Sequence, residues 1–117
     1  MKIAIIGSRN IGEIDLDKYV VHCDEIITGG ARGVDTCAEE YANEHGIKVT
    51  VITPDYNRYG RGAPIVRNKE IVDLSDKVLA FWDGSSRGTL SVINYARKTE
   101  KPCEVILCEA AKKAEEQ

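Results

Sequence analysis

Short apolar runs of strand length alternate with helical patterns along the chain, and this alternation constrains the fold more than any other feature. Each run is continuously apolar, which is typical of strands that helices cover on both faces. Between the runs, apolar residues recur three or four positions apart, as Val34, Ala38 and Ala42 do. We therefore predict an α/β fold: a Rossmann-like, doubly wound sheet of about five parallel strands in a three-layer α/β/α arrangement. The predicted strands lie at residues 3–6, 25–27, 49–52, 78–81 and 105–107.

The crossovers differ in how clearly the sequence marks their helices. Asp15 is a candidate N-cap for a short helix that would end near Val21. Pro64 fits the first turn of the third helix, where the missing N–H of proline has no partner to lose. Residues 109–117 are strongly charged and favour a helix or a solvated tail. We therefore predict one domain over residues 1–108, followed by a charged C-terminal segment.

Length and charge limit the classes of function. The chain has 117 residues, 43% of them hydrophobic, and a formal net charge of −3. This length allows one domain with a single core, and the acidic balance argues against a surface that binds nucleic acid along its whole length. No apolar stretch approaches the roughly 20 residues of a membrane span, and the start of the chain does not resemble a signal peptide. We expect a cytoplasmic protein with no membrane partner.

The cysteines give no sign of a metal site. Cys23, Cys37, Cys103 and Cys108 show no CxxC spacing, and only two histidines accompany them. Neither a zinc site nor a disulfide framework is indicated by this pattern. We expect buried free thiols, no metal and no cofactor.

Glycine and arginine concentrate in the loops that should follow the carboxyl ends of the strands. Arginine offers a rigid fork of donors that suits phosphate and carboxylate groups. Ligands of open α/β sheets bind at this edge, so arginine-rich loops in an acidic protein predict a small anionic ligand. Arg67 follows the third of these loops closely, and Arg97 lies elsewhere. The other five arginines all lie in the loops: Arg9, Arg32, Arg58, Arg61 and Arg87.

Two of these loops have the composition of phosphate cradles. Gly29 and Gly30 allow a sharp turn and close approach of a ligand, and the helix predicted from Gly33 directs unpaired amides and its positive dipole end toward the same place. Gly88 and Thr89 open the last helix in the same way. Ordinary turns with capping residues are the alternative for either loop. Neither loop matches GxGxxG or the P-loop, so dinucleotide-dependent oxidoreductases and NTPases gain no motif support.

Arg67 occupies an unusual position for a charged residue. It shares a predicted helix face with Ile71 and Leu74, and this face should pack against the sheet. A guanidinium there needs a carboxylate or a bound anion, because burying an unpaired charge costs several kcal/mol. Asp83 is the candidate partner within the protein. We favour a bound anion, since the first turn of this helix should lie beside the expected ligand site at the carboxyl ends of the strands.

The motifs at these positions resemble a known superfamily. The stretches are IIGSR at 5–9, TGGARGVD at 28–35, RNKEIVDLSD at 67–76 and the Gly88–Thr89 pair. They resemble the SLOG superfamily, which joins DNA-processing A proteins with LOG-type phosphoribohydrolases, and the resemblance spans residue 3 to about residue 107. The GSR, GGARGVD and RNKEI stretches look most like the DNA-processing A branch, and the length looks like that of small stand-alone nucleotide-binding members. The resemblance implies a Rossmann-like fold, a nucleotide-type ligand and a homodimer.

The LOG-type pattern is only partly matched. In those enzymes the fourth loop reads PGGxGTxxE, and its glutamate and an upstream arginine serve cleavage of the N-glycosidic bond of a nucleoside monophosphate. Arg67 matches that arginine and Gly88–Thr89 match GT, but Val92 stands at the position of the glutamate, and DGSS at 83–86 replaces the start of the loop. The resemblance therefore favours binding over hydrolysis. The candidate catalytic residues are Arg67, Asp35, Glu39 and Asp83.

The segment YNRYGRG at 56–62 interleaves aromatic and basic residues. Tyr56 and Tyr59 alternate with Arg58 and Arg61 and could stack one or two nucleotide bases, and its glycines would let the segment move as a lid. A mobile polar loop with surface tyrosines is the alternative. A channel for single-stranded DNA needs a longer basic track with stacking platforms, so nucleic acid is a less favoured partner.

The sequence thus predicts a small domain that binds a nucleotide or a nucleotide-derived phosphate. Phosphoribohydrolysis of nucleoside 5′-monophosphates and binding of single-stranded DNA are the alternatives. A homodimer is also expected, because a sheet this small should leave helix faces such as Ile93 with Ala96 partly uncovered. The predicted binding residues are Gly7, Ser8, Arg9, Gly29, Gly30, Arg32, Gly33, Arg67, Asn68, Ser85, Ser86, Gly88 and Thr89.

Overall fold

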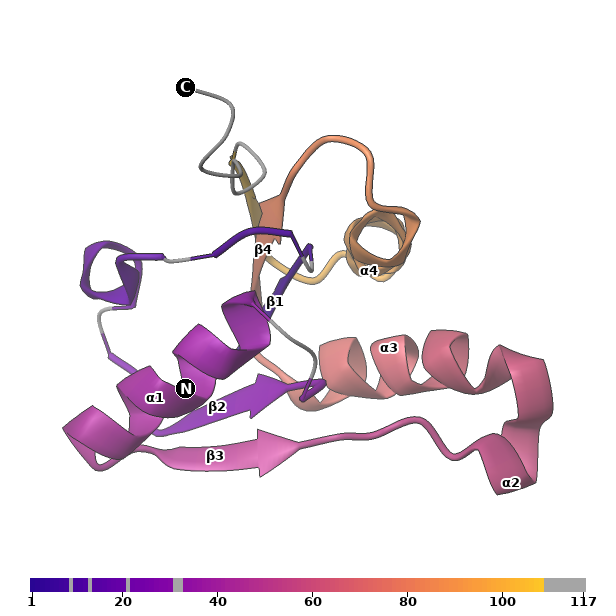
Figure 1. Ribbon diagram of the computed structural model, residues 1–117, viewed down its shortest axis with the longest axis horizontal. Coiled ribbons are helices and arrows are strands. Elements are labelled where there is room, and N and C mark those ends of the chain that lie inside the picture. Colours follow the sequence, from indigo (N-terminus) through magenta and orange to yellow (C-terminus); the bar gives the residue numbers. More distant parts are fainter. Residues whose placement is uncertain (9, 13, 21, 31–32, 109–117) are drawn as a thin grey trace, which may run out of the picture.

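A parallel sheet of five strands forms the centre of the molecule in the computed structural model (Figure 1). The structure describes residues 1–8, 10–12, 14–20, 22–30 and 33–108. The strand order is β3-β2-β1-β4-β5, which confirms the predicted Rossmann-like α/β fold. The predicted tail at 109–117 lies outside the described residues. The strands are β1 (Lys2–Gly7), β2 (Glu25–Thr28), β3 (Lys48–Val51), β4 (Lys77–Trp82) and β5 (Cys103–Leu107).

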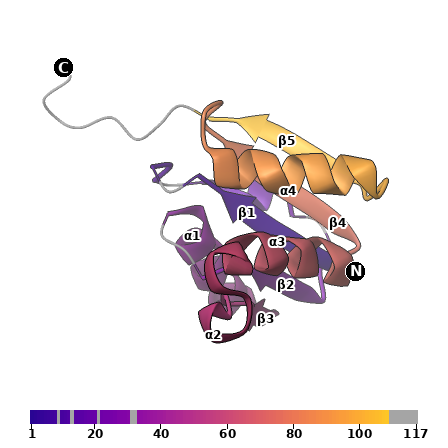
Figure 2. The same ribbon diagram turned by 90° about the vertical axis from the view of Figure 1, so that its right-hand side faces the viewer.

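Helices cover both faces of this sheet (Figure 2). The short 3-10 turn η1 and helix α1 pack on one face, and α3 and α4 pack on the other. A further pair of helical turns, α2 and η2, directly precedes α3. The helical elements are η1 (Leu16–Lys18), α1 (Val34–His45), α2 (Tyr56–Tyr59), η2 (Gly60–Gly62), α3 (Ala63–Leu74) and α4 (Arg87–Lys98).

The two layers of helices explain why the strand sequences are continuously apolar. Along β1, Ile3 and Ile5 belong to the core under α1, whereas Ala4 and Ile6 belong to the core under α3 and α4. All four residues are buried, because neighbouring strands and a helix layer enclose each face. The edge strand β5 is less covered, and its Leu107 is 72% exposed.

The segment predicted as a helix from Asp15 to Val21 is a single 3-10 turn, η1, over Leu16–Lys18. Asp15 is the N-cap residue of this turn, as predicted, but its side chain accepts no capping hydrogen bond. A segment this short gains too few hydrogen bonds to offset the cost of starting an α-helix. Its course is set by tertiary packing instead, because Leu16 and Val20 are both buried in the core. Val21 lies outside the described residues.

Three further expectations about burial are wrong. Leu74 does not pack on the sheet with Ile71, because it is the last residue of α3 and is 49% exposed. Ile93 and Ala96 are not partly uncovered, since both are fully buried between α4, α3 and the sheet. The expected homodimer therefore stays a prediction that rests on the family resemblance. The free cysteines are partly buried instead of fully buried: Cys23, Cys37, Cys103 and Cys108.

Candidate functional site

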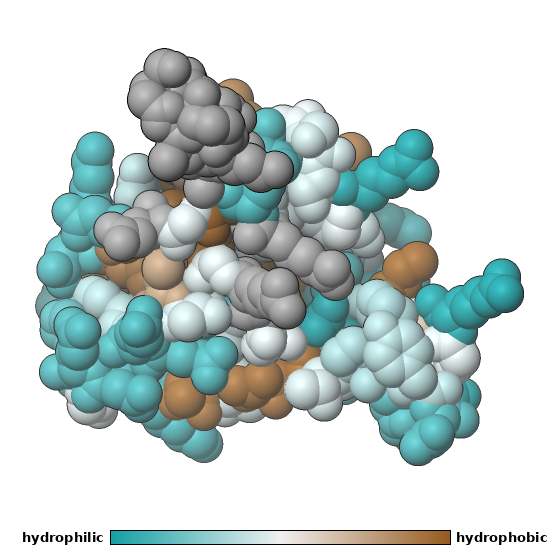
Figure 3. All heavy atoms as spheres, in the orientation of Figure 1, coloured by the Kyte–Doolittle hydropathy of each residue, from teal (hydrophilic) through white to brown (hydrophobic). Residues whose placement is uncertain are grey.

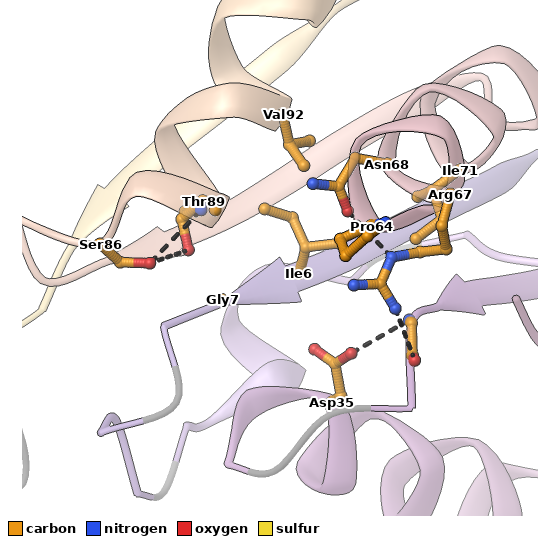
Figure 4. A pocket seen from close by; sticks show the side chains of 12 residues that line it. Ile6, Gly7, Asp35, Pro64, Arg67, Asn68, Ile71, Ser86, Thr89 and Val92 are labelled. Carbon is orange, nitrogen blue, oxygen red and sulfur yellow. Dashed lines mark hydrogen bonds between the residues drawn. The ribbon is translucent and has the colours of Figure 1, made fainter. Parts of the chain in front are cut away.

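A cavity of about 200 Å³ lies at the carboxyl ends of β1 and β2, between α3 and α4 (Figure 4). The chain leaves β1 and β4, which are neighbours in the sheet, toward opposite edges of the sheet. Such a topological switch point is where open α/β sheets bind their ligands. The lining residues are Ile6, Gly7, Gly29, Asp35, Pro64, Arg67, Asn68, Ile71, Ser86, Gly88, Thr89 and Val92.

Arg67 reaches into this cavity from the second turn of α3. Its Nε–H donates to Asn68 Oδ1 at 3.0 Å, and its NH1 group donates to the carbonyl oxygen of Gly29 at 3.1 Å. A guanidinium carries five N–H donors, so these bonds leave the NH2 group to face the space between Ile6 and Asp35 (Figure 4). None of the ion pairs between described residues includes Arg67.

Asp83 does not supply the partner that the sequence suggested for Arg67. Its Oδ1 accepts hydrogen bonds from the backbone N–H groups of Ser85 at 2.9 Å and Ser86 at 2.8 Å. These bonds hold the pKa of Asp83 at about 2, below its ordinary value of 3.8. Asp83 therefore stays charged and fixes the loop between β4 and α4. It does not line the cavity, which weakens it as a catalytic candidate.

Three hydroxyl groups meet at the start of α4. Ser86 caps the helix, since its Oγ accepts from the Thr89 N–H at 3.4 Å, and its hydroxyl donates to Thr89 Oγ1 at 3.2 Å. Ser8, which is buried, lies 3.4 Å from Thr89 Oγ1 and accepts from the Asp83 N–H at 3.2 Å. The Ser8 hydroxyl also bonds the Asp83 carboxylate, so the three hydroxyls and Asp83 form one network at the start of α4. Thr89 is the member of this cluster that meets the cavity together with Ser86.

Gly29 lies where two charged side chains approach the backbone. Its N–H donates to Asp35 Oδ2 at 3.0 Å, while its carbonyl oxygen accepts from Arg67. A Cβ atom at this position would lie 2.8 Å from Arg67 NH1 and 3.3 Å from Asp35 Oδ2. A side chain here would displace the Arg67 guanidinium, so glycine lets both charged side chains approach the backbone.

Different contacts explain why glycine occupies the other positions near the cavity. A Cβ on Gly7 would lie 2.5 Å from Val34 Cγ2, so Gly7 is required by packing between β1 and α1. Gly30 has a positive φ of 74°, which favours glycine. A Cβ on Gly88 would meet no atom of the described residues within 4 Å, so none of them requires glycine at this position.

The helix ends beside the cavity are electropositive. The first turns of α3 and α4 carry no acidic residue, and α4 begins with Arg87. An acidic residue in the first turn stabilises a helix, and a basic residue there destabilises it, because the N-terminal end of the helix dipole is positive. The starts of α3 and α4 lack such an acidic residue and therefore favour a bound anion. Arg87 itself is exposed and does not line the cavity.

The cavity brings together part of the predicted set. Gly30, Gly33 and Ser85 do not line it, and Ser8 lies behind Thr89. Arg9 and Arg32 lie outside the described residues. Sequence reasoning missed the apolar wall of Ile6, Pro64, Ile71 and Val92. The predicted residues that do line the cavity are Gly7, Gly29, Arg67, Asn68, Ser86, Gly88, Thr89 and the catalytic candidate Asp35.

The segment predicted as a lid is helical. Asp55 caps α2 by accepting from the Arg58 N–H at 3.1 Å, and the Arg58 guanidinium carbon lies 5.2 Å from the centre of the Tyr59 ring. The segment is therefore helical instead of a loop, but its tyrosines do lie at the surface, as that alternative expected. Tyr56 and Tyr59 are 61% and 39% exposed, and neither they nor Arg58 and Arg61 line the cavity. Closure of this segment over the cavity stays a prediction.

A second cavity, of about 290 Å³, lies between η1 and α1. Its charged residues are all acidic, and hydrophilic atoms dominate the side of the molecule over α1 (left in Figure 3). Among the described residues, no group of histidine, cysteine and acidic side chains is placed to hold a metal ion. The lining residues are Ile14, Leu16, Asp17, Cys37, Glu40, Tyr41 and Glu44.

No helix within the described part of the chain is long and apolar enough to cross a membrane. The cytoplasmic location predicted from the sequence is not tested by this observation and stays a prediction.

Comparison with known proteins identifies the family. The model of the YspA, cpYpsA-related SLOG family matches residues 1–59, which include β1, β2, α1 and β3. The chain is also 35% identical over 83 residues to the Gene 61 protein of Mycobacterium phage D29, and the alignment covers 66% of each chain. No solved structure gives a significant match. The chain belongs to the YspA, cpYpsA-related SLOG family, which confirms the predicted SLOG superfamily.

Proposed function

We propose that this chain binds a nucleotide or a nucleotide-derived phosphate in the cavity at the switch point. One observation carries this proposal: hydrogen-bond donors from α3 face the cavity without protein acceptors among the described residues. The NH2 group of Arg67 is one such donor. Asn68 turns its oxygen to Arg67, so its amide nitrogen faces the Val92 side of the cavity (Figure 4). Ser86 and Thr89 add hydroxyl groups to the lining of the same cavity.

A phosphate group satisfies these donors best. It accepts several hydrogen bonds at once, and bonds between charged groups are stronger than neutral ones. The starts of α3 and α4 add amides and positive dipole ends on the same side. Membership of the SLOG family supports a nucleotide-related ligand.

The size of the cavity supports partial enclosure of the ligand. At about 200 Å³ it is smaller than the roughly 300–1,000 Å³ of pockets that bury a whole drug-sized ligand. A phosphate and a sugar fill such a space, and a nucleobase would then lie outside it. The exposed tyrosines of α2 are candidates to contact that base.

Binding measured by calorimetry tests the proposal. Wild type, Arg67→Met and Arg97→Met are titrated with nucleoside mono- and diphosphates, after native mass spectrometry has checked each protein for a retained ligand. Arg97 is the matched control, because it is an exposed arginine in the last turn of α4. Loss of a charge-assisted hydrogen bond of about 1.5–3 kcal/mol predicts roughly 10- to 100-fold weaker binding for Arg67→Met alone. Equal affinities for the two variants would contradict this site. Binding only of oligonucleotides, with a steep salt dependence, would favour single-stranded DNA instead.

Hydrolysis of the N-glycosidic bond of nucleoside monophosphates is a second candidate, and the position of Asp35 favours it. Asp35 is the one carboxylate among the described residues that line the cavity, and it shares this cavity with Arg67. In the reaction, water adds to C1′, the bond from C1′ to the base breaks, and the base leaves with a proton. Asp35 would take the proton of the water in place of the glutamate that Val92 replaces. Release of free base by wild type, and its absence with Arg67→Ala, would establish this activity.

A further inference from the structure

Ser86 joins the end of β4 to the part of the cavity wall that α4 forms. Its side chain caps α4 and contacts Thr89 at the edge of the cavity (Figure 4). Its main chain is held by two residues that do not line the cavity. The Ser86 N–H donates to Asp83 Oδ1 at 2.8 Å, and the Ser86 carbonyl oxygen accepts from the Trp82 Nε1–H at 3.0 Å. The N–H, carbonyl and hydroxyl groups of Ser86 therefore all have partners within the protein.

Trp82 belongs to the sheet and not to the cavity. It is the last residue of β4, and its carbonyl oxygen accepts from the Cys108 N–H at 2.8 Å, just after β5. Its side chain is half-buried and packs against the core under α3 and α4. A strand positions a side chain more precisely than a loop does. The indole of Trp82 therefore directs one well-placed N–H donor at the start of α4.

The other bonds that hold Ser86 to α4 are longer. Its carbonyl oxygen accepts a helical bond from the Leu90 N–H at 3.2 Å, and its Oγ accepts from the Thr89 N–H at 3.4 Å. These lengths are at or beyond the upper end of the usual range of about 2.7–3.2 Å for N–H donors, so both bonds are weak. The shorter bonds from Trp82 and to Asp83 therefore do most to fix Ser86 relative to the sheet.

The position of Ser86 affects a ligand because α4 begins at the cavity. Ser86, Gly88 and Thr89 all line it. Groups that are already in place before a ligand arrives bind it more tightly, since ordering them on binding would lower the affinity.

We infer that Trp82 is a positioning residue of the proposed phosphate site. Its indole N–H holds Ser86, and through Ser86 the first turn of α4, in the arrangement that the phosphate contacts. This inference rests on the proposed function and adds to it a residue outside the cavity. The chain contains one tryptophan, so every indole signal belongs to Trp82.

Trp82→Phe tests the inference, because it removes the N–H donor and keeps an aromatic ring. Wild type and variant are titrated by calorimetry with AMP and with inorganic phosphate, at a temperature where melts show both proteins to be folded. We expect both dissociation constants to rise by the same factor, between about twofold and tenfold, as for the loss of one hydrogen bond. The factor should be the same because the two ligands share the phosphate.

Tyr95→Phe is the matched control. It also removes the hydrogen bond of one aromatic side chain at α4, since the Tyr95 hydroxyl donates to Asp73 Oδ1 on α3 at 2.9 Å. Neither of these residues lines the cavity. Tyr95→Phe should therefore leave both dissociation constants unchanged.

The indole N–H of wild type provides a readout that needs no variant of Trp82. In a ¹H–¹⁵N spectrum its resonance should shift as AMP or inorganic phosphate is added, and the shift should saturate at the dissociation constant from calorimetry. Arg67→Met should show no shift at the same concentrations. An indole resonance that stays in place while wild type becomes saturated would overturn the inference, even if Trp82→Phe folds poorly.

The outcomes separate the inference from the proposed function. If wild type binds neither AMP nor inorganic phosphate, the proposed function is wrong. If wild type binds both and Trp82→Phe binds them as tightly, the role of Trp82 is wrong and the phosphate site stands. Equal losses in Trp82→Phe and Tyr95→Phe would indicate general destabilisation, and a loss for AMP alone would place the phosphate away from α4. Either result overturns the inference.

Discussion

The two cavities of this protein are similar in size and opposite in chemistry. The cavity at the switch point, of about 200 Å³, takes its polar groups from α1, α3 and α4, and these groups are buried or half-buried. The acidic cavity, of about 290 Å³, takes its charges from η1 and α1, and these charges are exposed. Asp17, for example, is 72% exposed as a side chain and lies 3.5 Å from His45. Solvated carboxylates need no ligand, whereas buried donors without acceptors do. Burial of the polar groups, and not cavity volume, therefore distinguishes a candidate site.

The largest expected effect comes from Arg67→Met. Arg67→Met loses the hydrogen bonds to Asn68 Oδ1 and the Gly29 carbonyl oxygen. It also removes a half-buried charge that has no ion-pair partner among the described residues, which offsets this loss, so the free energy of unfolding without ligand should change by less than about 1 kcal/mol. A nucleotide present at about 100 times its dissociation constant should stabilise wild type by about 2.7 kcal/mol, and this gain should disappear in the variant. Thermal melts of both proteins, with and without nucleotide, make the measurement.

The matched control for this melt lies in the acidic cavity. Glu44→Gln changes an exposed charge there and should keep the full gain from nucleotide. If Arg67→Met melts far below wild type without any ligand, the arginine is a structural residue, and the distinction between the two cavities fails.

The sequence predicts the fold well because the burial pattern of each strand is a local signal. The run Ile3 to Ile6 is continuously apolar since both faces are covered, and β1 extends it by one residue at each end. The course of the chain at Asp15 to Val21 was predicted less well, because packing of Leu16 and Val20 decides it. Local pattern therefore predicts elements that are covered on both faces and fails for short segments held by distant contacts.

The site was predicted in position but not in geometry. The glycine-rich loop after β2 and the RNKEI stretch do meet at one cavity, as parallel strands require. The contact of Arg67 with the Gly29 carbonyl joins residues 38 positions apart, and no local pattern encodes it. Sequence reasoning placed Gly7 and Gly29 in the same binding set, although packing against Val34 requires glycine at position 7, and glycine at position 29 lets two charged side chains approach the backbone. Distances between segments are needed to separate such roles.

A second prediction concerns Asp83, whose carboxylate accepts hydrogen bonds from the backbone N–H groups of Ser85 and Ser86 in the loop between β4 and α4. Its depressed pKa of about 2 means that the ionised form stabilises the fold above the ordinary value of 3.8, and that this stabilisation is lost as the pH falls toward 2. The full shift corresponds to between about 2 and 3 kcal/mol, but solvent screens this loop, so we expect about 1 kcal/mol. Asp83→Asn should lower the free energy of unfolding by this amount at pH 7. Urea unfolding at several pH values measures it, and a difference that stays constant down to pH 2 would contradict the assignment.

A third prediction compares two glycines in helical backbone. Neither Gly88 in α4 nor Gly62 before α3 would bring a Cβ within 4 Å of another atom, and neither has a positive φ. Replacing either by alanine should therefore stabilise the protein by about 0.4–1 kcal/mol, because the unfolded chain loses freedom. Of these two glycines, only Gly88 lines the cavity at the switch point, so only Gly88→Ala should weaken nucleotide binding. Denaturant unfolding and calorimetry measure the two quantities, and equal affinities for both variants would remove Gly88 from the binding site.

The smallest expected effect lies in the acidic cavity, at Tyr41. Burial raises the pKa of this tyrosine above its ordinary value of 10, and the charge and hydrogen bond of Asp17 raise it further. Asp17→Asn removes the negative charge that raises this pKa and leaves the burial of Tyr41 unchanged. The pKa of Tyr41 should therefore fall and still remain above 10.

The same variant should leave the other properties of the protein almost unchanged. The ion pair of Asp17 with His45 is exposed, so its loss should cost less than about 1 kcal/mol. Nucleotide affinity should stay within about twofold, since solvent and salt screen an exposed charge over about 8–10 Å. Ultraviolet titration of wild type and Asp17→Asn, with Tyr41→Phe to assign the signal, measures the shift. An unchanged pKa would mean that water already screens Asp17 from Tyr41. A large change in nucleotide affinity would instead mean that the two cavities are coupled through α1, on which Asp35 and Tyr41 both lie.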